Sequence, residues 1–543
     1  MLSYLHSLPG GDNVSDTTDT PKAALWPETE LPPEPEPASD ACPPEPPRQP
    51  RFQPINRNQL LLHPMEVEKL VGPDHLVRAI WELVGRLDLT RYSSEVKAVE
   101  GVAGRPPYHP QLLISLWIYA YSQKISSAHE VERRCGYDPA FQWLTGMEVV
   151  NYHTLADFRV DHAQALDNLF TQLLAVLSSE GLIGLEGVVV HDGTKIEASA
   201  SGKSFHREET LRAHLKAARQ RVREMGDPRP EDAEASPRET AARQRAAREK
   251  VEKLELALKE MEKVQAAPQA NAGPSQRRVS ETDPEARIMK ENNGGCGPCH
   301  NVQVSTNPTQ QIIVAASVTQ ACNDQHEMVP AIAEIERQTG NPPQRLVVDE
   351  GYTTRENILD AAVLGVDLIG ARMEPNPQSV ARQLAKRGVD PGYFPDQFAY
   401  HADTDTCTCP QGKTLAYQTT KREQVGVERK VYKARAKDCR ACAVRQLCEP
   451  GQAGKRILRS ANVPVVADYV AKMQTEEAQA LYRLRAPVAE FSNLWLKEKL
   501  GLWKFCVRGL RKVRSEVLWA CLTYNIQQWF RLRWKDRRQP AEA

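Results

Sequence analysis

Two short apolar runs, each ending in an aspartate, constrain the fold of this chain more than any other feature. The first run leads from Gly187 to Asp192, and the second leads from Arg345 to Asp349. Continuous runs of β-branched and aliphatic residues are typical of strands that are buried on both faces of a sheet. Residues 195–199 are interpreted as the hairpin partner of the first run.

The segments around these two runs predict the rest of a core. Strands are expected at 301–305, 311–318 and 367–371, and helices are expected at about 325–338 and 354–364. The resulting order, β–β–β–α–β–α–β, predicts an α/β fold with a mixed sheet.

Helical segments flank and interrupt this core. Residues 58–180 are predicted to form an all-α N-terminal domain, because apolar residues at 112–121 and 165–177 recur at helical spacing. Residues 205–263 carry two apolar stripes with spacings of 4, 3, 4 and 3 on either side of a Gly- and Pro-containing break, which predicts an inserted helical hairpin. This hairpin is either an arm for dimerisation or DNA contact, or a surface insertion whose stripes cover only each other. Residues 461–543 are expected to be helical again.

Composition excludes several classes of protein. The chain has 543 residues, of which 41% are hydrophobic, enough for about two to four domains with real cores. The longest apolar run, near Leu112–Tyr121, is far shorter than the ~20 residues that span a bilayer, and the first residues lack the pattern of a secretory signal. We therefore expect a cytoplasmic protein without a membrane partner.

The formal net charge of zero hides a segregated distribution of charge. Residues 1–50 have a net charge of −7 and contain 12 of the 39 prolines, so residues 1–57 are predicted to be a disordered acidic tail. Residues 398–460 and 491–543 have net charges of +7 and +8. These basic segments favour a polyanionic partner such as nucleic acid, although an ordinary mixed surface explains the charge alone equally well.

Five of the 12 cysteines lie within residues 398–460, as C-x-C followed by C-x2-C-x5-C. A two-residue spacing lets two thiolates face one tetrahedral ion, and disulfides are not expected in the cytoplasm. We therefore predict a zinc-ribbon-like insertion, with reduced cysteines in a metal-free domain as the alternative. Cys407 or His401 could replace one ligand, and the run from Cys296 to His300 is a weaker second candidate. The preferred Zn²⁺ ligands are Cys409, Cys439, Cys442 and Cys448.

Three carboxylates are candidates for chemistry. Asp192 and Asp349 each follow a predicted strand, and a carboxylate at a strand end projects from the edge where open α/β folds place their sites. Glu490 lies between apolar Val488 and Phe491 on a predicted helix and could supply a third metal ligand. Taken singly, each has an ordinary structural explanation: a turn or cap for the aspartates, and an exposed helix position for the glutamate.

Four stretches of the chain together resemble the bacterial insertion-sequence transposases with a DDE catalytic domain. Residues 108–113 and 151–159 resemble the helical N-terminal domain of that family, and Val190–Ala198 and Val347–Tyr352 resemble the strands that bear its first and second catalytic Asp. The Y-R-E-K signature of the helix that bears the catalytic Glu resembles Tyr482, Arg485, Glu490 and Lys497. Four residues separate the Arg from the Glu here, against three in some members of the family.

The resemblance implies a ribonuclease-H-like catalytic core, divided by insertions into residues 185–397 and 461–543. It implies a DNA transposase that binds the terminal inverted repeats of an insertion sequence, cleaves phosphodiester bonds and joins 3′-OH ends to target DNA. Asp192, Asp349 and Glu490 would bind two Mg²⁺ (or Mn²⁺) ions, separate from the structural Zn²⁺. A nucleoid-associated homodimer or higher oligomer in a synaptic complex is expected.

Basic and aromatic side chains near the signature are the predicted contacts to double-stranded DNA: Tyr482, Arg485, Lys497, Arg508, Arg511 and Lys512. Their alternatives are packing for the tyrosine, surface ion pairs for the signature Arg and Lys, and a basic closing helix for the other three. Two other functions stay open. One is a catalytically inactive or domesticated DNA-binding zinc protein, and the other is a nuclease of the same fold that does not join strands.

Overall fold

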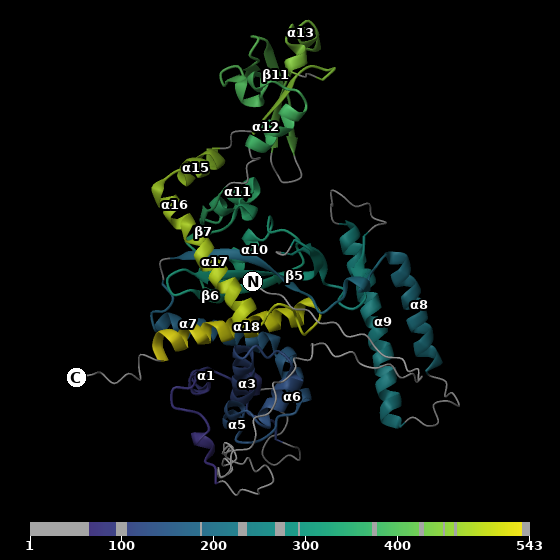
Figure 1. Cartoon of the computed structure of the whole chain (residues 1–543), viewed down its shortest axis with the longest axis vertical. Coiled ribbons are helices and arrows are strands. Elements are labelled where there is room, and N and C mark those ends of the chain that lie inside the picture. Colours follow the sequence, from purple (N-terminus) through teal and green to yellow (C-terminus); the bar gives the residue numbers. More distant parts are fainter. Residues whose placement is uncertain are drawn as a thin grey trace, which may run out of the picture. The chain divides into compact units, whose positions relative to one another are not determined.

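A computed structural model gives the arrangement of the chain (Figure 1). The structure describes residues 64–93, 106–184, 187–225, 236–266, 277–291, 294–371, 377–422, 428–448, 451–460 and 464–534. The chain divides into two units at Pro64 and Met65, and every element below belongs to the second unit. The predicted acidic tail at residues 1–57 lies outside the described residues.

The largest sheet of the described chain is mixed and has six strands. These are β1 (Val188–Glu197), β4 (Arg287–Lys290), β5 (Cys296–Asn307), β6 (Ile312–Thr319), β7 (Arg345–Val347) and β8 (Asp367–Ile369). The strand order is β4-β5-β1-β7-β8, with β6 also pairing with β5. β1 pairs antiparallel with β5 and parallel with β7, and β7 pairs parallel with β8. The predicted α/β fold with a mixed sheet is confirmed.

Strand β1 is longer than the sequence analysis predicts. It passes through Asp192, and its antiparallel ladder with β5 continues to Glu197. The interpretation of Lys195–Ser199 as a separate hairpin partner is therefore wrong, and Asp192 lies within the strand rather than at its end. The physical reason is that Thr194 and Ile196 are buried between half-buried neighbours, so the two-residue period of a strand continues past the Asp-Gly pair.

Seven α-helices precede the sheet in the described chain: α1 (Leu76–Gly85), α2 (Thr90–Ser93), α3 (Pro110–Ser122), α4 (Ala128–Cys135), α5 (Pro139–Thr145), α6 (Tyr152–Asp161) and α7 (Ala163–Ser179). Four of them begin with a side chain that accepts a hydrogen bond from an amide of the first turn, at His75, His109, Asp138 and Asn151. The helical character predicted for this part of the chain is confirmed.

Helix α18 (Leu510–Trp529) completes the core that these N-terminal helices begin. It packs against α3, α7 and β6, and Trp117, Phe170 and Trp519 lie in one continuous apolar cluster. Asn525 accepts a hydrogen bond from the Ile313 amide at 2.9 Å and donates one to the Ile313 carbonyl at 2.8 Å. This satisfies a peptide group where the β5–β6 ladder changes register.

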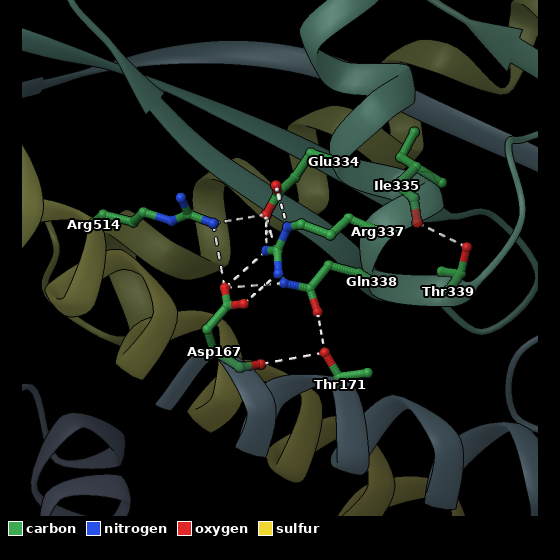
Figure 2. A network of polar contacts seen from close by, with 8 residues as sticks. All are labelled: Asp167, Thr171, Glu334, Ile335, Arg337, Gln338, Thr339 and Arg514. Atoms are coloured by element: carbon green, nitrogen blue, oxygen red, sulfur yellow. Dashed lines mark hydrogen bonds and ion pairs between the residues drawn. The ribbon is translucent and has the colours of Figure 1, made fainter. Parts of the chain in front are cut away.

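A polar network also joins α7, α10 (Met328–Thr339) and α18 (Figure 2). Arg337 on α10 forms ion pairs with Asp167 on α7 and with Glu334 on its own helix. Arg514 on α18 contacts the same two carboxylates, at 3.2 and 3.1 Å. Partly exposed pairs contribute only about 0–1 kcal/mol each, so the network fixes the relative position of the three helices more than it stabilises them.

The helical hairpin forms as predicted. Helices α8 (Glu208–Glu224) and α9 (Pro237–Ala266) lie side by side (Figure 1), and β2 (Phe205–His206) pairs with β3 (Val279–Ser280) at its base. The apolar stripes bury one another at Leu211, Leu215, Ala218, Leu254, Ala257 and Met261. Glu260 on α9 is 1% exposed and pairs with Arg287 on β4 at 2.5 Å, which ties the hairpin to the large sheet.

The Cys-rich insertion contains more regular structure than its turn-rich sequence suggests. Five strands form an antiparallel sheet in the order β13-β12-β11-β10-β9. They are β9 (Ala399–His401), β10 (Thr406–Thr408), β11 (Thr414–Arg422), β12 (Glu428–Ala434) and β13 (Arg456–Ser460), with α13 (Ala436–Arg440) and α14 (Arg445–Cys448) between the last two. Its core is small and consists of Phe398, Cys407, Leu415, Tyr432, Ala434 and Ile457.

The remaining α-helices are α11 (Arg355–Val363), α12 (Pro377–Lys386), α15 (Pro464–Met473), α16 (Glu476–Arg483) and α17 (Arg485–Leu494). Two π-helical turns follow α17 and α18, at Trp495–Lys499 and Phe530–Trp534. The single helix predicted for Tyr482–Leu500 is therefore divided. Pro487 lies in the first turn of α17, where its missing N–H costs least. Among the helices of the described ranges, none is long and apolar enough to cross a membrane.

Candidate active site

The parallel pairing of β1 and β7 brings two of the predicted carboxylates together. Val188 pairs with Arg345 and Val190 with Val347, so the same register continued by two residues sets Asp192 beside Asp349. Asp349 follows β7 and caps the short 3-10 turn Glu350–Tyr352, where it accepts a hydrogen bond from the Gly351 amide at 2.8 Å.

The pKa of Asp192 also indicates that Asp349 is close to it. Burial, followed by repulsion from the negative charge of Asp349, raises the pKa of Asp192 to about 6. Arg485 and the Gly193 amide oppose this rise, but they do not cancel it. A carboxylate that keeps its proton so far above its ordinary range is short of positive charge, which a bound cation would supply.

Helix α17 supplies the groups that touch Asp192. The Asn493 amide donates a hydrogen bond to Oδ2 of Asp192 at 3.2 Å, and Nη1 of Arg485 lies 3.8 Å from Oδ1. Within the described residues, Oδ1 of Asn493 is buried and has no hydrogen-bond partner. The amide oxygen of Asn493 and the carboxylate of Asp192, which Asn493 contacts, are oxygen donors of the kind that Mg²⁺ prefers.

Asp324 is a third acidic side chain near Asp192, and the sequence analysis missed it. It lies in the loop between β6 and α10 and adds to the negative charge that raises the pKa of Asp192. Its carboxylate accepts hydrogen bonds from Asn301 at 2.7 Å and Gln303 at 2.8 Å, and from Lys195 at 3.3 Å. The apolar run of β6 ends at Val318, six residues before Asp324, so Asp324 lacks the strand-end position that marked the other two aspartates.

Gly193 allows these groups to approach β1. A Cβ atom at this position would lie 2.6 Å from Nε2 of Gln303 and 2.7 Å from Oδ1 of Asp324, closer than such contacts occur. Gln303 also accepts hydrogen bonds from the Tyr352 hydroxyl at 2.5 Å and interacts with Nε2 of His191 at 2.9 Å. Burial lowers the pKa of His191 to about 4, so this histidine is a neutral packing partner beneath the site.

Glu490 is the predicted carboxylate that the structure does not place against the other two. Its side chain is exposed on α17, whereas Asn493, three residues further along the same helix, contacts Asp192. Residues three apart on a helix are neighbours on its surface, so Glu490 lies next to Asn493, the residue that contacts Asp192. Its role as the third ligand stays a prediction.

The signature Lys and Tyr occupy sheltered positions. Lys497 lies in the π-helical turn after α17, is 8% exposed, and has its ammonium group 5.5 Å from the centre of the Trp503 ring. Burial lowers its pKa, while Cys299 and Asp192 act in the opposite direction. Tyr482 on α16 packs half-buried against the core beneath β1 and β7. π-Helical turns occur often at functional sites.

The three other predicted DNA contacts lie at or just before the start of α18. Arg508 donates a hydrogen bond to the Ser199 carbonyl at 2.9 Å, while Arg511 and Lys512 are exposed. Arg511 lines two hollows, of about 350 and 500 Å³. The larger hollow is also lined by Arg91 and by Asp161.

The four preferred zinc ligands line one small cavity of about 30 Å³: Cys409, Cys439, Cys442 and Cys448. Sγ of Cys409 accepts a hydrogen bond from the Lys413 amide at 3.3 Å, and Sγ of Cys439 accepts one from the Lys455 amide at 3.4 Å. Amide donors of this kind stabilise thiolates. The four sulfur atoms converge without forming a cluster as tight as a loaded zinc site.

The alternative ligands lie elsewhere. Cys407 is fully buried in the core of the Cys-rich insertion, and His401 interacts with Oγ1 of Thr408 at 2.9 Å. Cys299 is buried on β5, where burial raises its thiol pKa to about 12, and Cys296 is exposed on the same strand. Residues three apart on a strand point to opposite faces, which argues against this second candidate.

Two family models match the chain. "Transposase domain (DUF772)" matches residues 65–161, and "Transposase DDE domain" matches residues 408–530. These matches confirm the resemblance to insertion-sequence DDE transposases and show that the chain carries transposase domains. Glu490 lies within the second match, whereas Asp192 and Asp349 lie between the two.

Among solved structures, one that is similar is the cryo-EM structure of a piggyBac transposase synaptic complex with hairpin DNA. The likeness covers 88% of this chain and 82% of that chain, with 9% sequence identity and a TM-score of 0.21. A score this low carries no argument about fold or function. No match was found among the curated proteins.

Proposed function

We propose that this chain, which carries a transposase DDE domain, binds the ends of an insertion sequence, cleaves phosphodiester bonds there and joins the 3′-OH ends to target DNA. The observation that carries this proposal is the proximity of Asp192, on β1, to Asp349, which follows the parallel strand β7, with the pKa of Asp192 raised to about 6. In this proposal Glu490 is the third carboxylate.

The residues present fit a divalent metal. Asp192, Asp349 and the unsatisfied Oδ1 of Asn493 are hard oxygen donors, the type that Mg²⁺ and Mn²⁺ prefer. Two such ions activate the attacking oxygen and stabilise the leaving oxygen of a phosphodiester. In our assignment Asp192, Asp349 and Glu490 would hold these ions.

The neighbouring side chains hold this arrangement and receive the DNA. Arg485 and Asn493 fix the orientation of the Asp192 carboxylate through their contacts with its two oxygens. Lys497, kept in a low-dielectric position near Asp192, would contact a phosphate next to the scissile bond. Tyr482 would stack on a sugar or base from the edge of the site.

We further assign the sheet to a ribonuclease-H-like core. Support comes from its strand arrangement, in which Asp192 lies on the first strand and Asp349 follows the strand parallel to it. The resemblance implies the same positions for the first two catalytic aspartates. The α8–α9 hairpin and the Cys-rich sheet then correspond to two insertions, the second held by Zn²⁺ on Cys409, Cys439, Cys442 and Cys448.

The basic start of α18 is the proposed surface for element-end or target DNA. Arg508, Arg511 and Lys512 lie within five residues of one another, and all three are exposed. Phosphate contacts release counterions, so each lysine or arginine that is removed should lower the salt dependence of binding by about one unit of slope. A synaptic complex of two or more chains completes the proposal.

The test uses the full chain, a fluorescent duplex of the element end, and Mg²⁺. Cleavage is measured on the intact end, and joining is measured with a pre-cut 3′-OH end. Alanine substitutions at Asp192, Asp349 and Glu490 should abolish both reactions and leave end binding largely intact. Matched controls are Glu350→Ala and Glu498→Ala, which remove exposed carboxylates close to the same elements.

Each result has a distinct meaning. Cleavage without joining would identify a nuclease of the same fold, and binding without either reaction would identify an inactive DNA-binding protein. Wild-type turnover by the Glu490 variant would remove Glu490 from the site and assign its place to Asn493 or Asp324.

A further inference from the structure

A further cluster of side chains, of types that can bind metals, lies at the base of the helical hairpin. It is separate from the carboxylates of the proposed reaction and from the cysteines of the Cys-rich insertion. It consists of His206 at the end of β2, His214 in α8 and Glu281 just after β3. One potential ligand atom of each lies within 4.8 Å of those of the other two. Within the described ranges, these are the residues that come together in this way.

The backbone around the cluster is fixed by local hydrogen bonds. The β2–β3 ladder pairs His206 with Val279, and the Glu281 amide donates a hydrogen bond to the Ser204 carbonyl at 3.0 Å. Oγ of Ser204 and Oγ of Ser280 form a further hydrogen bond at 2.7 Å. Two of the three ligands therefore belong to one rigid two-stranded unit.

His214 reaches this unit from α8. Its Nδ1 lies 2.9 Å from Oε2 of Glu281, and its ring centre lies 5.1 Å from that of His206 with the planes at 73°. Imidazoles at this distance and angle can turn a nitrogen toward a common point by a change in χ2, which is a soft torsion. Ligands of one Zn²⁺ lie about 2.0–2.2 Å from the ion, so only a small closure of the three groups is needed.

The chemistry of the donors selects a class of ion. Two imidazoles and one carboxylate suit Zn²⁺ and neighbouring transition metals, whereas Mg²⁺ takes oxygen ligands. The site is also accessible, because the side chains of His214 and Glu281 are 40% and 26% exposed. This leaves an open side for entry of the ion and for a water as the fourth ligand.

We propose that His206, His214 and Glu281 bind a divalent transition-metal ion, with Zn²⁺ as the best-fitting ion, and that the ion fastens α8 to the β2–β3 ladder. His214 and Glu281 are separated by 67 positions in sequence, and α9 lies between them. A bond across so long a segment restricts the unfolded chain and holds the base of the hairpin closed. This proposal is independent of the transposase reaction.

The test compares Zn²⁺ binding by full-length wild type and the His206→Ala/His214→Ala variant after chelation and dialysis. We expect the variant to bind one Zn²⁺ fewer per chain, whether or not the Cys-rich insertion is loaded. His153→Ala is the matched control, since it removes an exposed imidazole from α6 and should leave the stoichiometry unchanged. Equal zinc content in wild type and the double variant would overturn the proposal.

Hydrogen exchange supplies the second readout. Added Zn²⁺ should slow amide exchange in residues 205–215 and 278–282 of the wild type and have no effect there in the double variant. A purely structural His–Glu contact would instead give exchange that does not respond to Zn²⁺, and this result would also overturn the proposal. If the double variant does not fold, His206→Asn changes a single ligand and should weaken Zn²⁺ binding at least about tenfold.

Discussion

The proposed carboxylate site and the Cys-rich insertion both gather side chains of types that can bind metals, and they differ in what holds those side chains together. Asp192 lies on a strand, and Asp349 follows one, in a sheet whose apolar layer includes Val190, Leu346 and Val347. In the Cys-rich insertion, Cys409, Cys439 and Cys448 instead pack against a small core of six buried residues. The apolar packing of the sheet holds the two carboxylates in place although they repel each other. The Cys-rich insertion has a much smaller apolar core.

From this difference we expect that loss of metal at the carboxylates lowers catalytic activity, whereas loss of metal at the thiols lowers folding stability. At the carboxylates, burial and the neighbouring Asp349 raise the pKa of Asp192, and a bound cation would relieve this electrostatic strain. At the thiols, the proposed Zn²⁺ would supply stabilisation that a small core lacks. Removal of a ligand should therefore affect activity alone in the first region and folding in the second.

The largest expected effect is on activity. Asp192→Asn and Asp349→Asn should each lower the rate of end cleavage at least ~10³-fold, a loss of about 4 kcal/mol of transition-state stabilisation. Neither change should unfold the protein. Cleavage rates with Mg²⁺, together with urea unfolding of the same preparations, check both statements. An unfolded Asp192→Asn variant would break the comparison, because it would make the carboxylate a structural group.

The next effect concerns the stability of the Cys-rich insertion. Cys439→Ser and Cys442→Ser should cost several kcal/mol locally, because structural Zn²⁺ contributes a large share of the folding energy in small metal-held domains. Hydrogen exchange across residues 398–460 should become fast, while β1 and β7 stay protected. Cys135→Ser, at a buried cysteine in α4, is the control for loss of a thiol alone. Unchanged hydrogen-exchange protection across residues 398–460 would show that these thiols belong to a core that holds no metal.

A smaller effect should separate ligands from the residues that position them. Asn493→Leu removes the hydrogen bond to Asp192 and keeps a similar volume, so cleavage should fall about 10–100-fold. The metal dependence should shift as well, with more Mg²⁺ needed for half-maximal rate. A loss as complete as that of Asp192→Asn would make Asn493 a ligand in its own right.

The smallest effect is the pH dependence of stability in Mg²⁺-free buffer. The pKa of Asp192 is raised from 3.8 to about 6 in the folded chain, so the folded state holds a proton that the unfolded state has lost. Stability from this group should therefore fall as the pH rises between these two values, by on the order of 1–3 kcal/mol before solvent screening. Asp192→Asn should lack the fall, and Mg²⁺ should reduce it in the wild type. Urea unfolding across this range measures the difference, and identical profiles would contradict it.

Local patterns predicted much of this molecule. The strands, the hairpin stripes and the N-terminal helices follow from apolar periodicity, which burial imposes directly on the sequence. The predicted end of β1 was wrong because the Asp192-Gly193 pair was interpreted as a strand end. In the structure, the ladder with β5 continues past this pair to Glu197, and Gly193 provides the space that Asp324 occupies. Asp324 and Asn493 were missed because only tertiary packing brings them to Asp192.

The core shared by the N-terminal helices and α18 has a consequence for the synthesis of this protein. The apolar faces of α3 and α7 acquire their partner only when α18, which follows every strand of the sheet in sequence, has been made. Contacts between segments so distant in sequence form late and slowly. During translation, the apolar surfaces of α3 and α7 that contact α18 stay exposed to solvent until α18 has been synthesised. Chains that stop before α18 should therefore aggregate or be degraded. We therefore expect that chains ending before α18 do not reach the native state.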